Sequence, residues 1–174
     1  MLARKISRAK WEPKGYLGDD EIRADAVTGC LRTSDDALSW WRCADDEQDV
    51  AEVALALAMP VEIGKQKIDK IDVVLLQDAD LVGLGLSLNP TVGIAIVDDL
   101  RSRHVDVVYF DLERLARLAR LLAPRIRSET KVFTFTRSQV KALLKAALDK
   151  NRFKEDKLNE EVRSELRGNP SSPA

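Results

Sequence analysis

Apolar residues recur at helical spacing in three segments of the chain, and the residues that flank these segments fit helix ends. Ser, Thr, Asp and Asn cap helix N-termini because their side chains accept backbone N–H groups, and proline interrupts helical hydrogen bonds. The predicted helices are one over Asp45 to Met59 capped by Asp45 or Asp46, one between the cap Asp111 and Pro124, one that opens at Thr136 with Gln139 in a capping box, and a polar final helix over Asp156 to Leu166. The residues predicted to face the core from the second and third helices are Leu112, Leu115, Leu118, Ala119 and Leu122, and Val140, Leu143, Leu144, Ala147 and Leu148.

Shorter apolar runs, several of them rich in β-branched residues, predict strands. These runs are Ala26 to Leu31, Ala37 to Cys43, Ile71 to Leu76, His104 to Phe110 and Lys131 to Phe135. The turn residues Thr33 to Asp36 predict that the first two runs form a hairpin. The run Leu81 to Leu88 contains two glycines, which indicates a weak strand or an irregular connection.

The order of these elements favours an α+β fold with a mixed or mostly antiparallel sheet packed against three to four helices. The length of 174 residues fits one domain. We expect this domain to comprise residues 1–167 and to be followed by a disordered tail at 168–174, which contains two prolines and no large apolar residue.

The composition excludes several classes of protein. Apolar residues make up 45% of the chain and no apolar run approaches the roughly 20 residues that span a bilayer, so we expect no membrane contact. Trp11, Glu12 and Pro13 follow the basic N-terminus where a signal peptide would have an apolar segment, so we expect a cytoplasmic protein. Cys30 and Cys43 are too few for a disulfide scaffold, and we interpret both as buried and inert.

The net charge of −1 conceals a strong separation of charge along the chain. Residues 1–18 carry a net charge of +4, residues 19–100 carry −12, residues 101–157 carry +8 and residues 158–174 carry −1. Separated charge of this kind influences which partners a protein meets and how fast it associates with them.

Two adjacent tryptophans, Trp40 and Trp41, lie in a predicted strand. Successive side chains of a strand point to opposite faces, so one indole lies on each face. Either the strand is covered on both faces by its own chain, or Trp40 anchors a partner protein together with Arg42, since tryptophan is enriched at interface centres. The acidic residues of the segment that would form this docking surface are Asp35, Asp36, Asp45, Asp46, Glu47 and Asp49.

Three basic residues of the helix that opens at Thr136 form a stripe opposite its leucine face. These residues are Arg137, Lys141 and Lys145. The basic residues of 101–157 can form a solvated face, bind nucleic acid, or meet an acidic surface that belongs either to a partner or to residues 19–52 of the same chain.

The remaining chemical signals are weak. Four aspartates follow apolar runs, where carboxylates can bind Mg²⁺ or can simply begin turns, namely Asp78, Asp80, Asp98 and Asp99. The only histidine, His104, cannot form a two-histidine zinc site, and no G-x-S-x-G motif accompanies it, so we expect it to be exposed or structural. No glycine-rich phosphate loop is present.

The sequence therefore predicts a non-catalytic interaction module or accessory subunit of the antitoxin, immunity or adaptor kind, with no cofactor and no bound metal. Its partner would be another protein, either a basic one or a second copy of the same chain. One alternative is a nucleic-acid-binding protein that uses residues 101–157, and a second is a magnesium-dependent enzyme that uses the four aspartates.

Overall fold

The computed structural model describes residues 1–15, 17–18 and 21–168, and its framework is one antiparallel sheet. The strands are β1 (Leu2–Ile6), β2 (Leu38–Arg42), β3 (Ile71–Leu76), β4 (Ser87–Pro90), β5 (His104–Val108) and β6 (Val132–Phe135). They lie in the order β4-β5-β2-β1-β3-β6, and every neighbouring pair is antiparallel. The predicted α+β class is confirmed.

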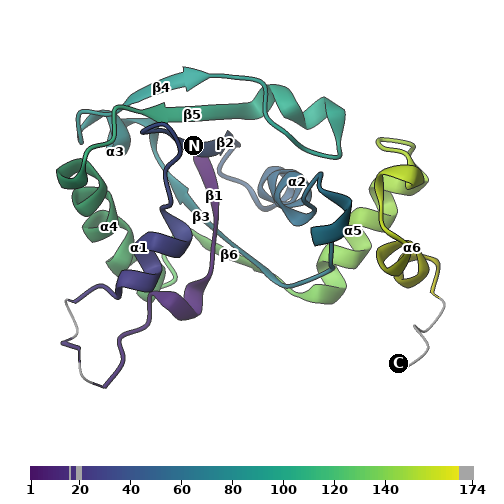
Figure 1. Ribbon diagram of the computed structural model, residues 1–174, viewed down its shortest axis with the longest axis horizontal. Coiled ribbons are helices and arrows are strands. Elements are labelled where there is room, and N and C mark those ends of the chain that lie inside the picture. The colour runs from purple at the N-terminus through teal and green to yellow at the C-terminus, as the bar shows by residue number, and fades with distance from the viewer. Residues whose placement is uncertain (16, 19–20, 169–174) are drawn as a thin grey trace.

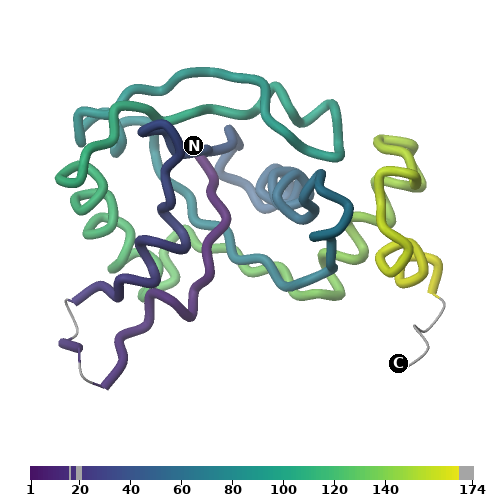
Figure 2. Tube along the Cα trace, viewed as in Figure 1, coloured from purple at the N-terminus to yellow at the C-terminus, as the bar shows by residue number. Residues whose placement is uncertain are grey.

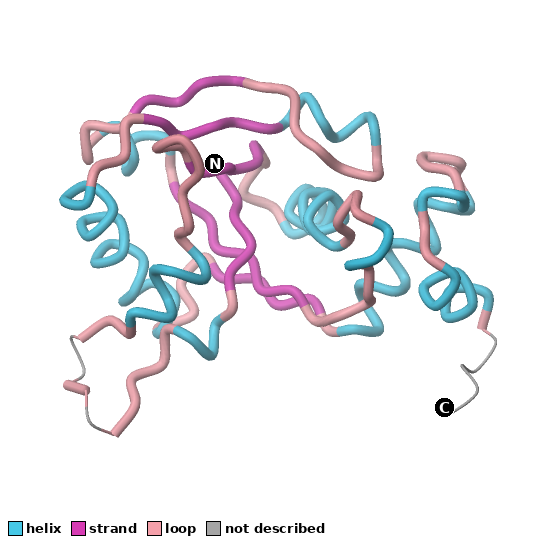
Figure 3. Tube along the Cα trace, in the orientation of Figure 1, coloured by secondary structure: helices cyan, strands magenta, loops and turns pink. Residues whose placement is uncertain are grey.

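Helices cover both faces of this sheet, and each face has its own apolar core. The helices are α1 (Ala24–Cys30), α2 (Glu47–Ala58), α3 (Asp78–Val82), α4 (Leu112–Arg127), α5 (Arg137–Asp149) and α6 (Glu160–Arg167). Figure 1 shows α1, α3 and α4 on one side and α2, α5 and α6 on the other, and Figure 3 shows the strands between these two groups. The fold thus has three layers, helix on sheet on helix.

The two tryptophans of β2 divide between the two cores, as expected for successive residues of a strand. Trp40 belongs to the core that contains residues of α1, α3 and α4, and Trp41 belongs to the core that contains residues of α2, α5 and α6. Both indoles are buried, Trp40 completely. The interpretation that its own chain covers this strand on both faces is therefore correct, and Trp40 is not a surface residue.

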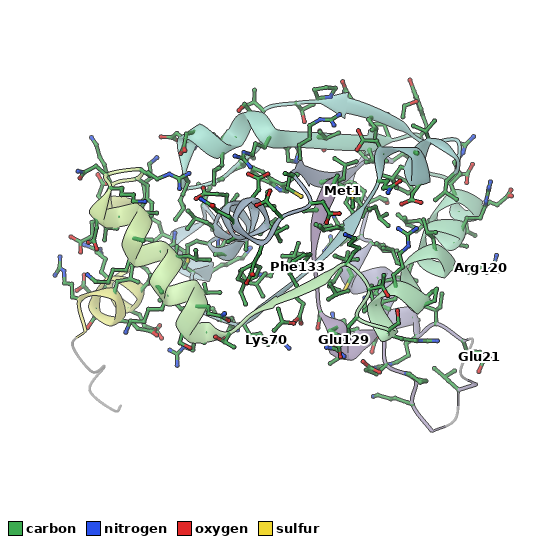
Figure 4. All side chains as sticks on the ribbon, turned by 180° about the vertical axis from the view of Figure 1, so that it is seen from behind. Met1, Glu21, Lys70, Arg120, Glu129 and Phe133 are labelled. Carbon is green, nitrogen blue, oxygen red and sulfur yellow. The ribbon has the colours of Figure 1, made fainter. Side chains whose placement is uncertain are left out.

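The N-terminal strand β1 lies in the middle of the sheet, between β2 and β3. Figure 2 shows the chain starting at the centre of the molecule, and Figure 4 shows Met1 near the middle of the sheet from behind. Arg4 of β1 donates to the carbonyls of Cys30 and Ser39 and lies 6.0 Å from the Trp40 ring centre. Burial lowers the pKa of Arg4 to about 10. The first residues of the chain therefore tie α1 and β2 to the centre of the sheet.

Three of the four predicted helix starts are confirmed by their capping bonds. Asp46 accepts from the N–H of Asp49 at 2.8 Å, and Asp111 accepts from that of Arg114 at 2.7 Å. Thr136 and Gln139 form the predicted capping box. The final helix, predicted from Asp156, instead begins at Glu160, because the side chain of Asn159 accepts from the N–H of Val162 and caps it there. The predicted strand Ile71 to Leu76 has the same bounds as β3.

The prediction of a strand over Ala26 to Leu31, and with it the hairpin, is wrong. This segment is the helix α1, in which Ala26 and Cys30 lie one turn apart and face the core. Only the turn of the predicted hairpin exists. Asp35 and Asp36 both have left-handed φ angles, of 52° and 56°, which aspartate tolerates better than most residues.

Pro124 does not end α4, which continues to Arg127. Pro124 is exposed, so the carbonyl of Arg120, which loses its helical donor there, can bond to water. Ile126 then anchors the last turn in the core. Leu112 is also misplaced by the sequence pattern, because it lies 83% exposed in the first turn of α4.

The segment between β3 and β5 differs from the prediction as well. Residues 78–82 form the short helix α3, and only Ser87–Pro90 form a strand, at one edge of the sheet. Residues 93–97 form a connection, in which Gly93 and Ala95 are buried and Ile94 between them is exposed. Gly168 ends α6 with a left-handed φ of 82°, and residues 169–174 of the predicted tail lie outside the described residues.

Truncation of core leucines should test the assignment of helical faces. Leu118→Ala, Leu122→Ala and Leu144→Ala should each lower the free energy of unfolding by about 2–5 kcal/mol, because all three side chains are buried. Leu112→Ala is the matched control and should cost less than about 0.5 kcal/mol. Urea denaturation measures all four, and equal costs at positions 112 and 118 would contradict the orientation of α4.

Candidate functional site

The acidic and basic halves of the sequence pair with each other inside the folded chain. Within the described residues, the ion pairs that join residues 19–100 to residues 101–157 are Asp45 with Lys131, Asp49 with Arg103, Glu52 with Arg152, Asp80 with Arg125, Asp98 with Lys157 and with Arg101, and Asp99 with Arg152. Much of the charge separation seen along the sequence is thus compensated within the fold. Part of the basic region therefore meets acidic residues of the same chain.

The predicted docking residues do not form one surface around Trp40, whose side chain is inaccessible. Arg42 is exposed and pairs with Asp78 of α3 at 2.9 Å. Asp46 caps α2, and Asp49 accepts from the N–H of Ala44 and from Arg103, each at 2.6 Å. The N–H of Ala44 and the guanidinium of Arg103 hold the pKa of Asp49 below its usual value.

The basic stripe of α5 is an exposed helix face with local partners. Arg137 donates to the carbonyl of Ile68 at 3.1 Å and pairs with Glu165 of α6 at 2.8 Å. Lys145 pairs with Asp149 one turn on, at 3.6 Å. Within the described part of the chain, Lys141 is the member of this stripe without an ion pair.

The four aspartates considered as Mg²⁺ ligands are each committed to a basic side chain. Asp80 forms a bidentate ion pair with Arg125, with N–O distances of 2.8 and 3.0 Å, and this pair lowers the pKa of the Asp80 carboxyl. In the ranges that the structure describes, no group of three or more His, Cys, Asp or Glu side chains is arranged to hold a metal ion. Cys30 and Cys43 are free and buried, and burial raises the pKa of Cys43 to about 11, so this thiol stays protonated.

The hydrogen bonds and ion pairs of Asp49 in α2 predict that substituting this residue changes the stability of the fold rather than the binding of a partner. Asp49→Asn should lower the free energy of unfolding by about 1–2 kcal/mol, because it removes charged hydrogen bonds to Ala44 and Arg103. Because the pKa of Asp49 is depressed in the folded state, this contribution is present above the unfolded pKa of about 3.8 and is lost as the pH falls through the folded value.

Asp45→Asn is the matched control for Asp49→Asn. It breaks only the exposed pair with Lys131 and should cost less than about 0.5 kcal/mol. Denaturation at neutral pH measures both variants. Equal stability of the two variants would contradict the role assigned to Asp49.

A groove lies where the helical layer of α2 leaves the sheet uncovered. Its cavity of about 620 Å³ lies between the sheet, the C-terminal end of α2 and the connection after β4. Apolar side chains of Trp41, Leu57 and Met59 share its lining with polar ones of Lys5 and Ser39. A concave, partly apolar site with a few polar groups is the usual form of a binding site.

His104 lies in this groove and is held by a hydrogen-bonded network. Its Nδ1 lies 2.7 Å from Thr91 Oγ1, and that hydroxyl donates to Asp106 at 2.9 Å. Since Thr91 has a single hydroxyl hydrogen, Nδ1 carries the proton that it shares with Thr91, and Nε2 is an acceptor. Burial lowers the pKa of His104, although the nearby carboxylate of Asp106 opposes this shift.

This network orients His104 but does not complete a hydrolytic site. The ring also packs edge-on against Trp41, with 5.2 Å between the ring centres. Ser39 is bonded to Asp106, at 3.4 Å, and among the described residues no Ser or Cys is bonded to Nε2. The prediction of a structural histidine fits this geometry, because a nucleophile must lie within hydrogen-bond reach of its base.

His104 should make stability depend on pH near neutrality. The pKa of His104 in the folded state lies below its value of 6.5 in the unfolded chain. The stabilisation that the neutral ring gives to the fold is therefore complete above pH 6.5, and it is lost as the pH falls through the pKa of the folded state. Between about pH 7.5 and 5.5, the wild type should lose more stability than His104→Gln, which cannot titrate there. Urea titrations at both pH values test this, and parallel losses would contradict it.

Next to the groove, four large aliphatic side chains are exposed on two neighbouring segments. Val92 and Ile94 are each 79% exposed, and Val61 and Ile63 are 43% and 49% exposed. Segments 60–65 and 92–96 both border this groove and a second cavity of about 730 Å³. We call these four residues the aliphatic ridge, and exposed apolar clusters of this kind mark interaction sites.

Sequence reasoning missed the aliphatic ridge, although a signal for it exists. Residues 81–97 contain no charged residue, in a chain whose residues are 33% charged. In a buried strand such a run is ordinary, but here it includes an edge strand and an exposed connection. The absence of charge, rather than any motif, distinguishes the part of the ridge formed by Val92 and Ile94, whereas Glu62 separates Val61 from Ile63 in the other part.

Comparison of the chain with protein-family models, with curated proteins and with solved structures gives no match in any of the three. In the described ranges, no helix combines the length and the apolar character needed to cross a bilayer. The assignment of function therefore depends on the geometry of the aliphatic ridge and the groove beside it.

Proposed function

We propose that this protein is a non-catalytic interaction module that binds a polypeptide through the aliphatic ridge. The observation that carries the proposal is the exposure of Val92 and Ile94, each at 79%, beside a groove of about 620 Å³. Exposed aliphatic side chains beside a cavity lose water when a partner covers them, and this loss favours association. An accessory subunit or adaptor would act in this way.

The state of the charged groups supports this proposal over its alternatives. The basic residues of 101–157 form several ion pairs with the acidic half, which leaves fewer cations to neutralise phosphates. The aspartates considered for Mg²⁺ are paired with Arg or Lys. By contrast, Val92 and Ile94 of the aliphatic ridge remain 79% exposed.

Panning a random linear peptide library against the purified chain tests the proposal. We expect enriched peptides that carry aliphatic residues and lose at least about tenfold in affinity on Ile94→Asp, since anchor residues are commonly worth more than about 1.4 kcal/mol. Binding is measured by fluorescence polarisation at a low protein concentration.

Val82→Asp is the matched control, because Val82 is also aliphatic and is 59% exposed on α3, away from the groove. Circular dichroism verifies that both variants fold. The proposal is wrong if no peptide is enriched, or if the enriched peptides bind the two variants equally.

A further inference from the structure

The connection after β4 continues the edge of the sheet as an extended segment. The N–H of Thr91 donates to the carbonyl of His104 at 3.2 Å, and the N–H of Gly93 donates to that of Arg101 at 2.9 Å. In an extended chain, alternate residues direct their backbone groups to opposite sides. Val92 and Ile94 therefore direct their N–H and C=O groups away from the sheet, and within the described residues these groups have no hydrogen-bond partner.

This segment is held in place from the side of the sheet. A Cβ added to Gly93 would lie 2.6 Å from Cβ of His104 and 2.8 Å from the Trp41 ring, so only glycine allows this close approach. Thr91 is fixed by the network of His104 and Asp106. The unpaired backbone of Val92 and Ile94 is thus presented by an ordered support, which lowers the entropic cost of pairing.

Beyond Pro90, this edge lacks the features that usually prevent strand pairing. Proteins protect exposed edges with charged side chains, especially lysine, and with proline. Residues 81–97 contain no charge, and Pro90 lies before the exposed pair rather than within it. A strand that carries Val92 and Ile94 at 79% exposure is therefore open to a further strand.

A second copy of the chain fits this edge particularly well. Val92 and Ile94, on either side of Gly93, each offer one backbone N–H donor and one C=O acceptor. This pattern of backbone groups is complementary to itself about a two-fold axis. Two identical surfaces also bring identical charges together near that axis, where they repel. Because residues 91–95 carry no charge, this segment can pair with the same segment of a second copy without such repulsion.

We infer that two copies of the chain associate by antiparallel pairing of their Thr91–Ala95 segments, with the two-fold axis close to Gly93. Val92 of each copy lies opposite Ile94 of the other, and each N–H of this pair donates to the facing carbonyl. The inference rests on the proposed function and names its partner as a second copy of this chain.

Sedimentation velocity over a concentration series, up to about 1 mM, tests this inference on the full chain, since weak specific association falls within that range. We expect a reversible monomer–dimer equilibrium. Val92→Lys and Ile94→Lys should each raise the dimer dissociation constant at least about 100-fold, because they place like charges at the axis. Val82→Lys is the control and should leave the dissociation constant unchanged within about twofold.

Hydrogen exchange then identifies the paired groups. In the dimer, the amides of Val92 and Ile94 should exchange at least about tenfold more slowly than in the monomer. A chain that stays monomeric, a dimer insensitive to both lysine variants, or a dimer that leaves these two amides unprotected would overturn the inference. If the chain is monomeric but peptides bind the aliphatic ridge, the proposed function stands and only the second copy is excluded.

Discussion

The burial of two adjacent tryptophans on one strand determines the architecture of this protein. Because neighbouring side chains of β2 point to opposite faces, Trp40 and Trp41 can both leave water only if both faces of the sheet are covered. The helices divide accordingly, with α1, α3 and α4 on one face and α2, α5 and α6 on the other. The central position of β1 completes this arrangement, since Leu2 and Ala3 each contribute to one of the two cores.

The three-layer arrangement also explains the fate of the charges. Residues that are far apart in the sequence meet in the fold, where Asp49 of α2 pairs with Arg103 before β5, and Asp80 of α3 pairs with Arg125 of α4. The more exposed pairs, such as Asp45 with Lys131, contribute little free energy to the fold. A separation of charge along a sequence therefore does not imply a separation of charge on the surface.

The interaction surface arises where this arrangement is incomplete. α2 covers only part of its face of the sheet, and the groove beside His104 occupies the uncovered part. The connection after β4 borders this groove, with Thr91 and Gly93 held against the sheet and with Val92 and Ile94 exposed. The contacts that order this connection are the same contacts that keep its unpaired backbone extended and accessible.

The sequence by itself determined the elements whose signals are local. The cap at Asp111, the capping box of Thr136 and Gln139, and the run Ile71 to Leu76 depend on neighbours along the chain, so the pattern predicted them. Tertiary structure decided the features that depend on distant residues. Ala26 to Leu31 became a helix because one of its faces packs against the core, and Trp40 became buried because α4 covers it. The sequence also did not determine that Val92 and Ile94 are exposed. An uncharged apolar run looks the same in sequence whether another element covers it or leaves it open to solvent.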